Sequence, residues 1–97
     1  MVTLAFREYG ENLGTRQLGA VARERLLSLM QVNDSVVLDF TGVNVVSNSF
    51  ADECIAKVLL EMPLEELKRR TTFHGLNPIA SACVLTALKR RHLALTV

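Results

Sequence analysis

Hydrophobic residues alternate with polar ones at the start of the chain and then recur at helical spacing. The alternation from Val2 to Phe6 is typical of a short strand. The polar, glycine-containing stretch from Tyr9 to Gly14 predicts a loop, and Thr15 after it is a candidate helix N-cap. The buried stripe of this helix is predicted to consist of Leu18, Val21, Ala22, Leu26, Leu29 and Met30, with Arg16, Arg23, Glu24 and Arg25 on the opposite face.

A continuous apolar run from Val36 to Phe40, interrupted only by Asp39, predicts a central strand covered on both faces, as in a parallel sheet. After a bend at Thr41-Gly42 the chain is expected to stay extended to Val46. Ser47-Asn48-Ser49 then precede a second helix, in which Ser49 and Asp52 resemble a capping box. The apolar face of this helix would carry Phe50, Cys54, Val58 and Leu59. Pro63 either ends this helix or begins a short one that runs through Leu67.

The last third of the chain predicts one more strand and one more helix. Thr71 to His74 is rich in residues that favour strands, and Asn77-Pro78 is a strong helix start. The apolar face is expected to carry Ile79, Cys83, Leu85 and Leu88. Cations up to His92 would close the helix, and Leu93 to Val97 would form an edge strand or a packed tail. Strands alternating with helices predict an α/β sandwich with a mostly parallel or mixed sheet of about four strands and about three to four helices.

Composition is that of one globular domain, residues 1–97, with 22% charged residues and no tryptophan. We expect a cytoplasmic protein with free thiols. The first residues show no secretory signal, no apolar stretch reaches the ~20 residues of a membrane span, and two cysteines make no disulfide scaffold.

Charge is unevenly divided along the chain although its net value is only +1. All ten acidic residues lie at or before Glu66, whereas six of the eleven basic residues follow it. These six form two clusters, Lys68, Arg69, Arg70 and Lys89, Arg90, Arg91. The clusters have three interpretations: cations that complement helix ends, an anion- or nucleic-acid-binding patch, and a surface that attracts an acidic protein or a second copy of the chain.

Catalysis has little support in the sequence. Cys54, Cys83, His74 and His92 show none of the close pairs that structural zinc sites use. A nucleophilic pair of Cys83 and His74 would lack a third residue to orient it. The glycines near Thr15 do not match a phosphate-binding loop. We therefore expect a protein that is not an enzyme and holds neither metal nor cofactor.

The segment from Val36 to Glu53 resembles the centre of STAS domains, the fold of bacterial anti-sigma factor antagonists. In that family an apolar strand ends in Asp, a Gly-containing bend follows, and an Asp-Ser-Ser/Thr-Gly motif opens a helix. Because Ser49-Phe50-Ala51-Asp52-Glu53 opens the helix here, the chain is most similar to the STAS-like family of unknown function. The resemblance implies a protein-binding regulatory domain.

Asp39 matches the strand-end Asp of that family, and Ser47 to Phe50 align with its helix-opening motif. The resemblance implies a partner kinase of the histidine-kinase-like ATPase superfamily, or an anti-sigma factor. The usual phosphate acceptor position holds Asn48, and Phe50 replaces the family's Gly. Ser49, one residue further on, is then either a candidate phosphorylation site or simply a helix cap.

The predicted function is a non-enzymatic protein-interaction module in bacterial signalling, with a homodimer left open. Phe50 would belong to the core or anchor a partner, and Asp39 would serve the strand end or the partner site. The alternative is an anion- or nucleic-acid-binding protein that uses the two basic clusters, although nucleic acid is poorly supported because aromatic residues are not interleaved with them. The predicted partner-binding residues are Asp39, Ser47, Asn48, Ser49, Phe50, Asp52 and Glu53.

Overall fold

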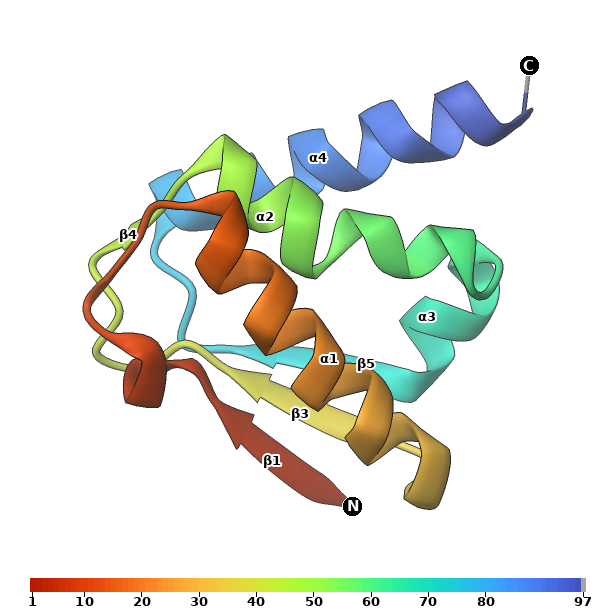
Figure 1. Cartoon of the computed structure of the whole chain (residues 1–97), viewed down its shortest axis with the longest axis horizontal. Helices are drawn as coiled ribbons and strands as arrows, with labels where there is room; N and C mark the ends of the chain where they lie inside the picture. The colour runs from red at the N-terminus through yellow and green to blue at the C-terminus, as the bar shows by residue number, and fades with distance from the viewer. Residues whose placement is uncertain (97) are drawn as a thin grey trace.

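Three parallel strands form the base of the molecule in a computed structural model that describes residues 1–96 (Figure 1). Strand β3 (Val36–Asp39) lies between β1 (Val2–Ala5) and β5 (Thr71–His74). Val36 is paired with Val2 on one side and with Thr71 on the other. The predicted α/β class and the central position of β3 are confirmed.

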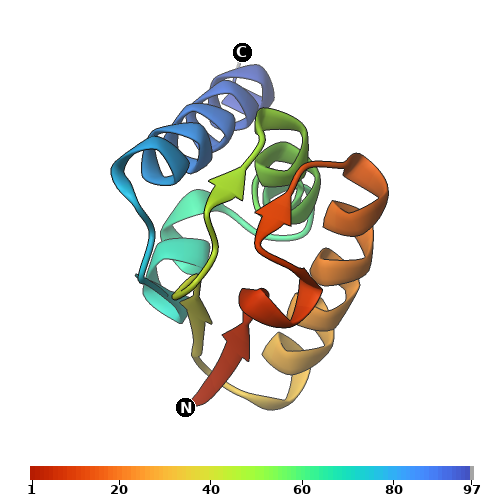
Figure 2. The ribbon, with the colours of Figure 1, turned by 90° about the vertical axis from the view of Figure 1, so that its left-hand side faces the viewer.

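A second sheet lies beside the first and contains only two short parallel strands, β2 (Asn12–Leu13) and β4 (Val45–Val46). Tyr9 to Gly14 was expected to be a loop throughout, so β2 was missed. A strand of two residues is too short to show the alternation of polar and apolar residues that predicts a strand. Its pairing depends on β4, which lies next to β2 in space. The strand β4 leads directly into the second α-helix (Figure 2).

Helices cover one side of the main sheet, and α2 (Asn48–Cys54) lies between α1 (Arg16–Val32) and α4 (Pro78–Thr96) (Figures 1 and 2). The predicted caps are confirmed: the Thr15 hydroxyl oxygen accepts the backbone N–H of Leu18 at 3.1 Å, and Asn77 accepts that of Ala80 at 2.8 Å. The helical segments are η1 (Phe6–Tyr9), α1 (Arg16–Val32), α2 (Asn48–Cys54), η2 (Ala56–Leu60), α3 (Leu64–Arg70) and α4 (Pro78–Thr96). The helix expected to run on from Phe50 therefore changes to 3₁₀ geometry after Cys54.

The prediction that β3 is covered on both faces is wrong. Val36 and Leu38 are buried, while Val37 and Asp39 between them are only half-buried. On the same face as Val37, the paired Thr72 is exposed. A run of apolar residues cannot distinguish one covered face from two, because Val37 remains partly accessible while still contacting its neighbouring strands.

Aromatic rings connect the sheet to α2 at the centre of the core. The Phe6 and Phe40 rings are stacked with centroids 4.1 Å apart, and Phe50 meets Phe6 edge-on at 6.2 Å. All three side chains are essentially inaccessible to solvent. Phe50 is therefore a core residue, as the helical spacing of Phe50 and Cys54 indicated, and it holds the start of α2 over the ends of β1 and β3.

Helix α4 buries a face different from the predicted one. Its buried positions are the small residues Ala80, Val84 and Ala87, whereas Ile79 and Leu85 are exposed. Small side chains allow α4 to lie close to its neighbours, so the larger apolar residues turn outward. The helix also continues to Thr96, so no edge strand begins at Leu93, and Lys89 to Arg91 occupy its interior and not its end. Val97 lies outside the described residues.

Arg70, at the end of α3, binds the end of α1. Its guanidinium donates to the backbone carbonyls of Met30, Asn33 and Asp34 and pairs with Glu66 at 3.2 Å. The carbonyls at a helix end lack partners within the helix, so a cation there satisfies them and complements the helix dipole. Part of the first basic cluster is thus structural.

Replacing Arg70 by alanine is expected to lower the free energy of unfolding by about 2 kcal/mol, because several charge-assisted hydrogen bonds are lost. The neighbouring Arg69 is exposed and its side chain has no ion pair or hydrogen bond among the described residues, so Arg69→Ala is the matched control. It should change stability by less than ~0.5 kcal/mol. Urea denaturation of both variants measures the difference. Equal effects would contradict a stabilising role for the contacts between Arg70 and the end of α1.

Candidate functional site

The residues predicted to bind a partner divide between the core, an ion-pair network and the surface of α2. The N-cap of α2 is Ser47, whose hydroxyl oxygen accepts the backbone N–H of Phe50 at 3.0 Å. The expected cap, Ser49, instead lies within the first turn. Several polar residues in succession offered equally good caps, and the position of Phe50 in the core selected the earlier one.

Glu53 is buried where α1 packs against α2, with its side chain only 9% exposed. Its carboxylate pairs with Arg23 at 2.7 Å, Lys57 at 2.9 Å and Arg16 at 3.2 Å. Arg23 was predicted to lie on the exposed face of α1 but reaches across to α2. Hydrogen bonds from Arg23 and Lys57, with a smaller contribution from Arg16, lower the pKa of Glu53 from 4.5 to about 2. Glu53 thus holds two helices together and is not accessible to a partner.

Close approach of these helices depends on Gly19 of α1. A Cβ atom there would lie 2.9 Å from the Cβ of Glu53 and 3.2 Å from the backbone oxygen of Phe50. Both distances are too short for an ordinary contact, so the glycine permits the geometry in which Arg23 reaches Glu53.

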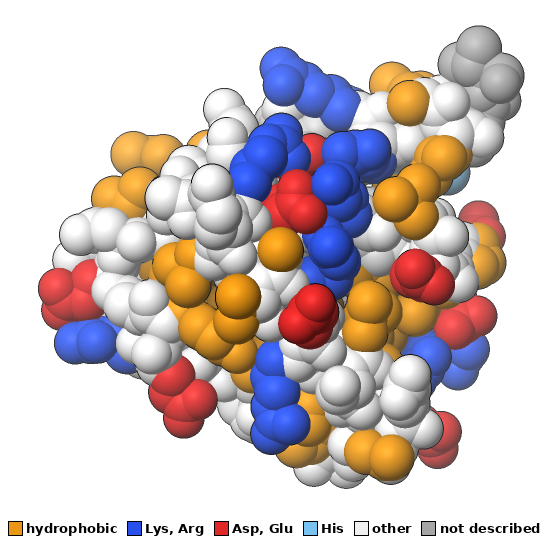
Figure 3. All heavy atoms as spheres, in the orientation of Figure 1, with side chains coloured by type: hydrophobic (Ala, Val, Ile, Leu, Met, Phe, Trp, Pro, Cys, Tyr) orange, Lys and Arg blue, Asp and Glu red, His pale blue; other side chains and the backbone are white. Residues whose placement is uncertain are grey.

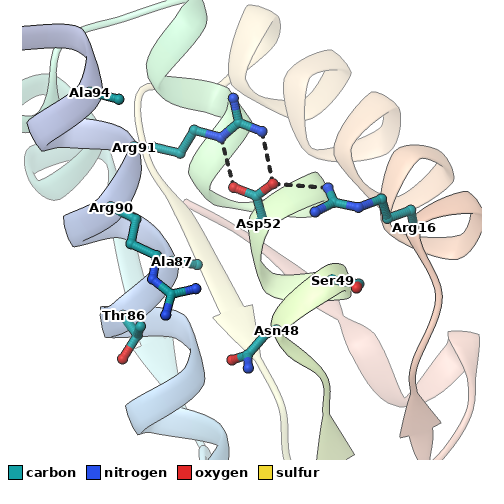
Figure 4. A pocket seen from close by; sticks show the side chains of 9 residues that line it. All are labelled: Arg16, Asn48, Ser49, Asp52, Thr86, Ala87, Arg90, Arg91 and Ala94. Carbon is teal, nitrogen blue, oxygen red and sulfur yellow. Dashed lines mark hydrogen bonds and ion pairs between the residues drawn. The ribbon is translucent and has the colours of Figure 1, made fainter.

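Asp52 joins α2 to α4 and α1. Arg91 donates to both carboxylate oxygens, at 2.7 and 2.8 Å, and Arg16 adds a third bond at 2.9 Å (Figure 4). These hydrogen bonds, that of Arg91 above all, hold the pKa of Asp52 well below its usual range. Because a bidentate pair of arginine and carboxylate is strong, Arg91 holds α4 against α2.

Asn48 is exposed and Ser49 is half-buried beside a hollow between α2 and α4. The hollow measures about 310 Å³, and Arg90 reaches into it from α4 (Figure 4). The structure thus brings together three residues predicted for a partner, Asn48, Ser49 and Asp52, and two predicted for an anion, Arg90 and Arg91. Its nine lining residues are Arg16, Asn48, Ser49, Asp52, Thr86, Ala87, Arg90, Arg91 and Ala94.

An apolar hollow of about 430 Å³ lies where β4 meets the start of α4. Val45 and Ile79 line it while remaining 49% and 79% exposed. Asn77 closes one side by donating its amide N–H to the carbonyl of Asn44 at 2.9 Å. This hollow could not be predicted from the sequence, because the helical spacing placed Ile79 on the buried face of α4 and Val45 belonged to an ordinary extended segment.

Asp39 lies at the carboxyl end of β3 and lines neither hollow. Its carboxylate accepts the Thr41 hydroxyl at 2.6 Å and the Thr41 backbone N–H at 2.9 Å. The two bonds lower its pKa. This is the hydrogen-bonding pattern of an Asp that begins a turn, so its local contacts account for its position after the strand.

The thiol of Cys54 is not placed for nucleophilic chemistry. Cys54 is fully buried, and burial raises the pKa of its thiol to about 12, so it has little thiolate character. Within residues 1–96, no three side chains of His, Cys, Asp or Glu are grouped as a metal site would require.

The parallel sheet, the helix opening after the central strand and the helices over one face define a small α/β domain of STAS-like architecture. The chain belongs to the family described as a STAS-like domain of unknown function (DUF4325), which matches residues 19–79. That family was predicted from the segment between Val36 and Glu53, which lies inside the matched region.

No curated protein and no solved structure matches the chain. Among the described residues, no helix has both the length and the apolar character required to cross a membrane.

Proposed function

We propose that this STAS-like domain is a non-enzymatic protein-interaction module that acts in bacterial cytoplasmic signalling. Its contact area, called here the α2 surface, consists of Val45, Asn48, Ser49 and Ile79. The partner presents an apolar side chain to Val45 and Ile79 and polar groups to the start of α2. A histidine-kinase-like ATPase or an anti-sigma factor is the partner class that the resemblance to anti-sigma factor antagonists implies.

The exposure of Ile79 beside Val45 is the observation that carries this proposal. A large aliphatic residue that is 79% exposed loses contact with water when a partner covers it, and such anchors contribute strongly to binding. Isolated exposed apolar residues are ordinary. Here two of them line one hollow, and Asn48, two residues after the end of β4 in the chain, is also exposed.

The α2 surface differs from the set of residues predicted from sequence. Phe50 is in the core, and Asp52 and Glu53 are held by arginines, so these three support the surface from beneath. Ser47 is occupied as a helix cap. The Ser49 hydroxyl has no hydrogen bond within residues 1–96, so Ser49 remains the better candidate for phosphorylation.

The nucleic-acid alternative has less support. Arg70 is bound to the end of α1 and Arg91 to Asp52, so one arginine of each basic cluster is occupied by contacts within the protein. Two cations are left in each cluster, Lys68 with Arg69 and Lys89 with Arg90, and the two remaining arginines line different hollows, which share no residue. A track along a phosphate backbone needs a continuous row of cations.

The partner is best identified by placing a photo-crosslinking amino acid at Asn48 in the native cells. With the purified partner, Ile79→Asp is expected to weaken binding at least tenfold, because a carboxylate replaces a buried anchor (about 1.4 kcal/mol per factor of ten). Val32 is the matched control, since it is an aliphatic residue with 80% exposure at the far end of α1.

Val32→Asp should leave the affinity unchanged, and both variants should keep the wild-type circular dichroism spectrum. Similar affinities for the two variants would contradict the α2 surface. So would crosslinks that form equally well from position 32 and position 48.

A further inference from the structure

The hollow between α2 and α4 contains an arginine that the fold does not use. Arg90 extends from α4 toward α2 and lines the hollow (Figure 4). Within residues 1–96 its guanidinium has neither an ion pair nor a hydrogen bond, although the neighbouring Arg91 makes a bidentate pair. An arginine left over at a concave surface is free to bind an oxyanion.

The charge of the hollow is positive. Three arginines and one aspartate line it. Because Asp52 already accepts bonds from Arg91 and Arg16, its carboxylate does not compete for Arg90. In Figure 3 the Lys and Arg side chains gather over the region where α1, α2 and α4 meet. An anion entering the hollow would find excess positive charge already in place.

Three side chains whose hydrogen-bond donors have no partner among the described residues line the same hollow. The Asn48 amide, the Ser49 hydroxyl and the Thr86 hydroxyl make no hydrogen bond with any other described residue. Each of these groups can donate to an oxygen acceptor. Asn48 and Ser49 come from α2, and Thr86 and Arg90 from α4, so donors border the hollow on two sides.

We propose that this hollow binds the phosphate group of a small phosphate monoester. Arg90 would form a forked contact with two phosphate oxygens, and the donors of α2 would reach the third. A phosphate monoester carries nearly two negative charges at neutral pH and three acceptor oxygens, which suits this set better than a carboxylate. The volume of about 310 Å³ lies at the lower end of small-ligand sites, ~300–1,000 Å³.

This site shares Asn48 and Ser49 with the α2 surface, whereas Arg90 and Thr86 belong to the anion site alone and Val45 and Ile79 line the other hollow. Anion binding can be measured on the chain alone, without a partner. Its failure would therefore leave the protein-interaction proposal standing, and failure of the partner experiment would leave the anion site standing.

The test is a titration of the isotope-labelled protein with inorganic phosphate and then phenyl phosphate, followed by NMR at constant ionic strength. Saturable shifts are expected at the amides of Asn48, Ser49 and Arg90. Arg90→Gln should weaken phosphate binding roughly tenfold, because the charged fork is lost. Arg69→Gln removes the same charge from an exposed, unpaired arginine elsewhere and should leave binding unchanged.

Arg90 is exposed, so its replacement is expected to leave the fold intact, and the melting temperature checks this. A second variant, Thr86→Glu, places a carboxylate in the hollow and should also abolish the shifts. The proposal is overturned by non-saturable shifts, by equal weakening in Arg69→Gln, or by acetate binding as tightly as phosphate.

Discussion

Replacing Phe50 with alanine should lower the free energy of unfolding by about 3–5 kcal/mol, the largest effect expected for a single substitution here. The Phe50 side chain is fully buried and meets Phe6 edge-on in the centre of the core. Its loss removes apolar contacts and leaves a cavity between the sheet and α2. A domain of this size has a total stability of about 5–15 kcal/mol, so a large part of it would disappear.

Phe73→Ala is the matched control for this experiment. The Phe73 ring contacts another aromatic ring, that of Phe40, with centroids 6.3 Å apart. The Phe73 side chain is only half-buried, so its replacement by alanine should lower the free energy of unfolding roughly half as much. Chemical denaturation gives both values, and the melting temperature should fall about 4–8 °C for each kcal/mol. If Phe50→Ala were no more destabilising than Phe73→Ala, Phe50 would be a surface anchor and not a core residue.

Replacing Glu53 with glutamine should lower the free energy of unfolding by about 2 kcal/mol at neutral pH. The change removes the negative charge that three cations share, while it keeps the side-chain shape. Breaking a fully buried pair costs more, about 3–5 kcal/mol, but Arg23 and Lys57 are partly accessible and can be hydrated. Glu11→Gln is the control, because Glu11 and Arg7 form an exposed pair worth less than ~1 kcal/mol.

The effect of Glu53 should depend on pH in a defined direction. Its pKa falls from 4.5 in the unfolded chain to about 2 in the folded protein, so the folded state favours the carboxylate. This stabilisation is complete above the unfolded pKa and is lost as the pH falls from about 5 toward 2. Melting temperatures of the wild type and Glu53→Gln should therefore differ at neutral pH and converge near pH 2. A difference that does not change with pH would show that charge is not the cause.

Much of the fold could be predicted because its signals are local. The apolar run at β3, the strand-forming residues of β5, and the caps at Thr15 and Asn77 all act within a few residues. Strands that alternate with helices also indicate a parallel sheet. The segment between Val36 and Glu53 was enough to predict the family, since it contains the ordered strand, bend and helix opening.

The candidate site was predicted less well, because its residues come from distant parts of the chain. Arg91 meets Asp52 and Arg23 meets Glu53 across large sequence separations. A sequence pattern places each residue on its own helix but does not say which neighbour that helix faces. The apolar hollow at Val45 and Ile79 likewise requires β4 and α4 to meet.

The sequence by itself determined most of the segments that form strands and helices, because capping and apolar spacing are interactions of near neighbours. Only the tertiary structure decided which face of each element is covered. On α4 the small residues Ala80 and Ala87 are buried against the elements that this helix covers, so Ile79 turned outward and Arg91 reached Asp52 while Arg90 did not. The surface open to a partner or a ligand is what this packing leaves uncovered.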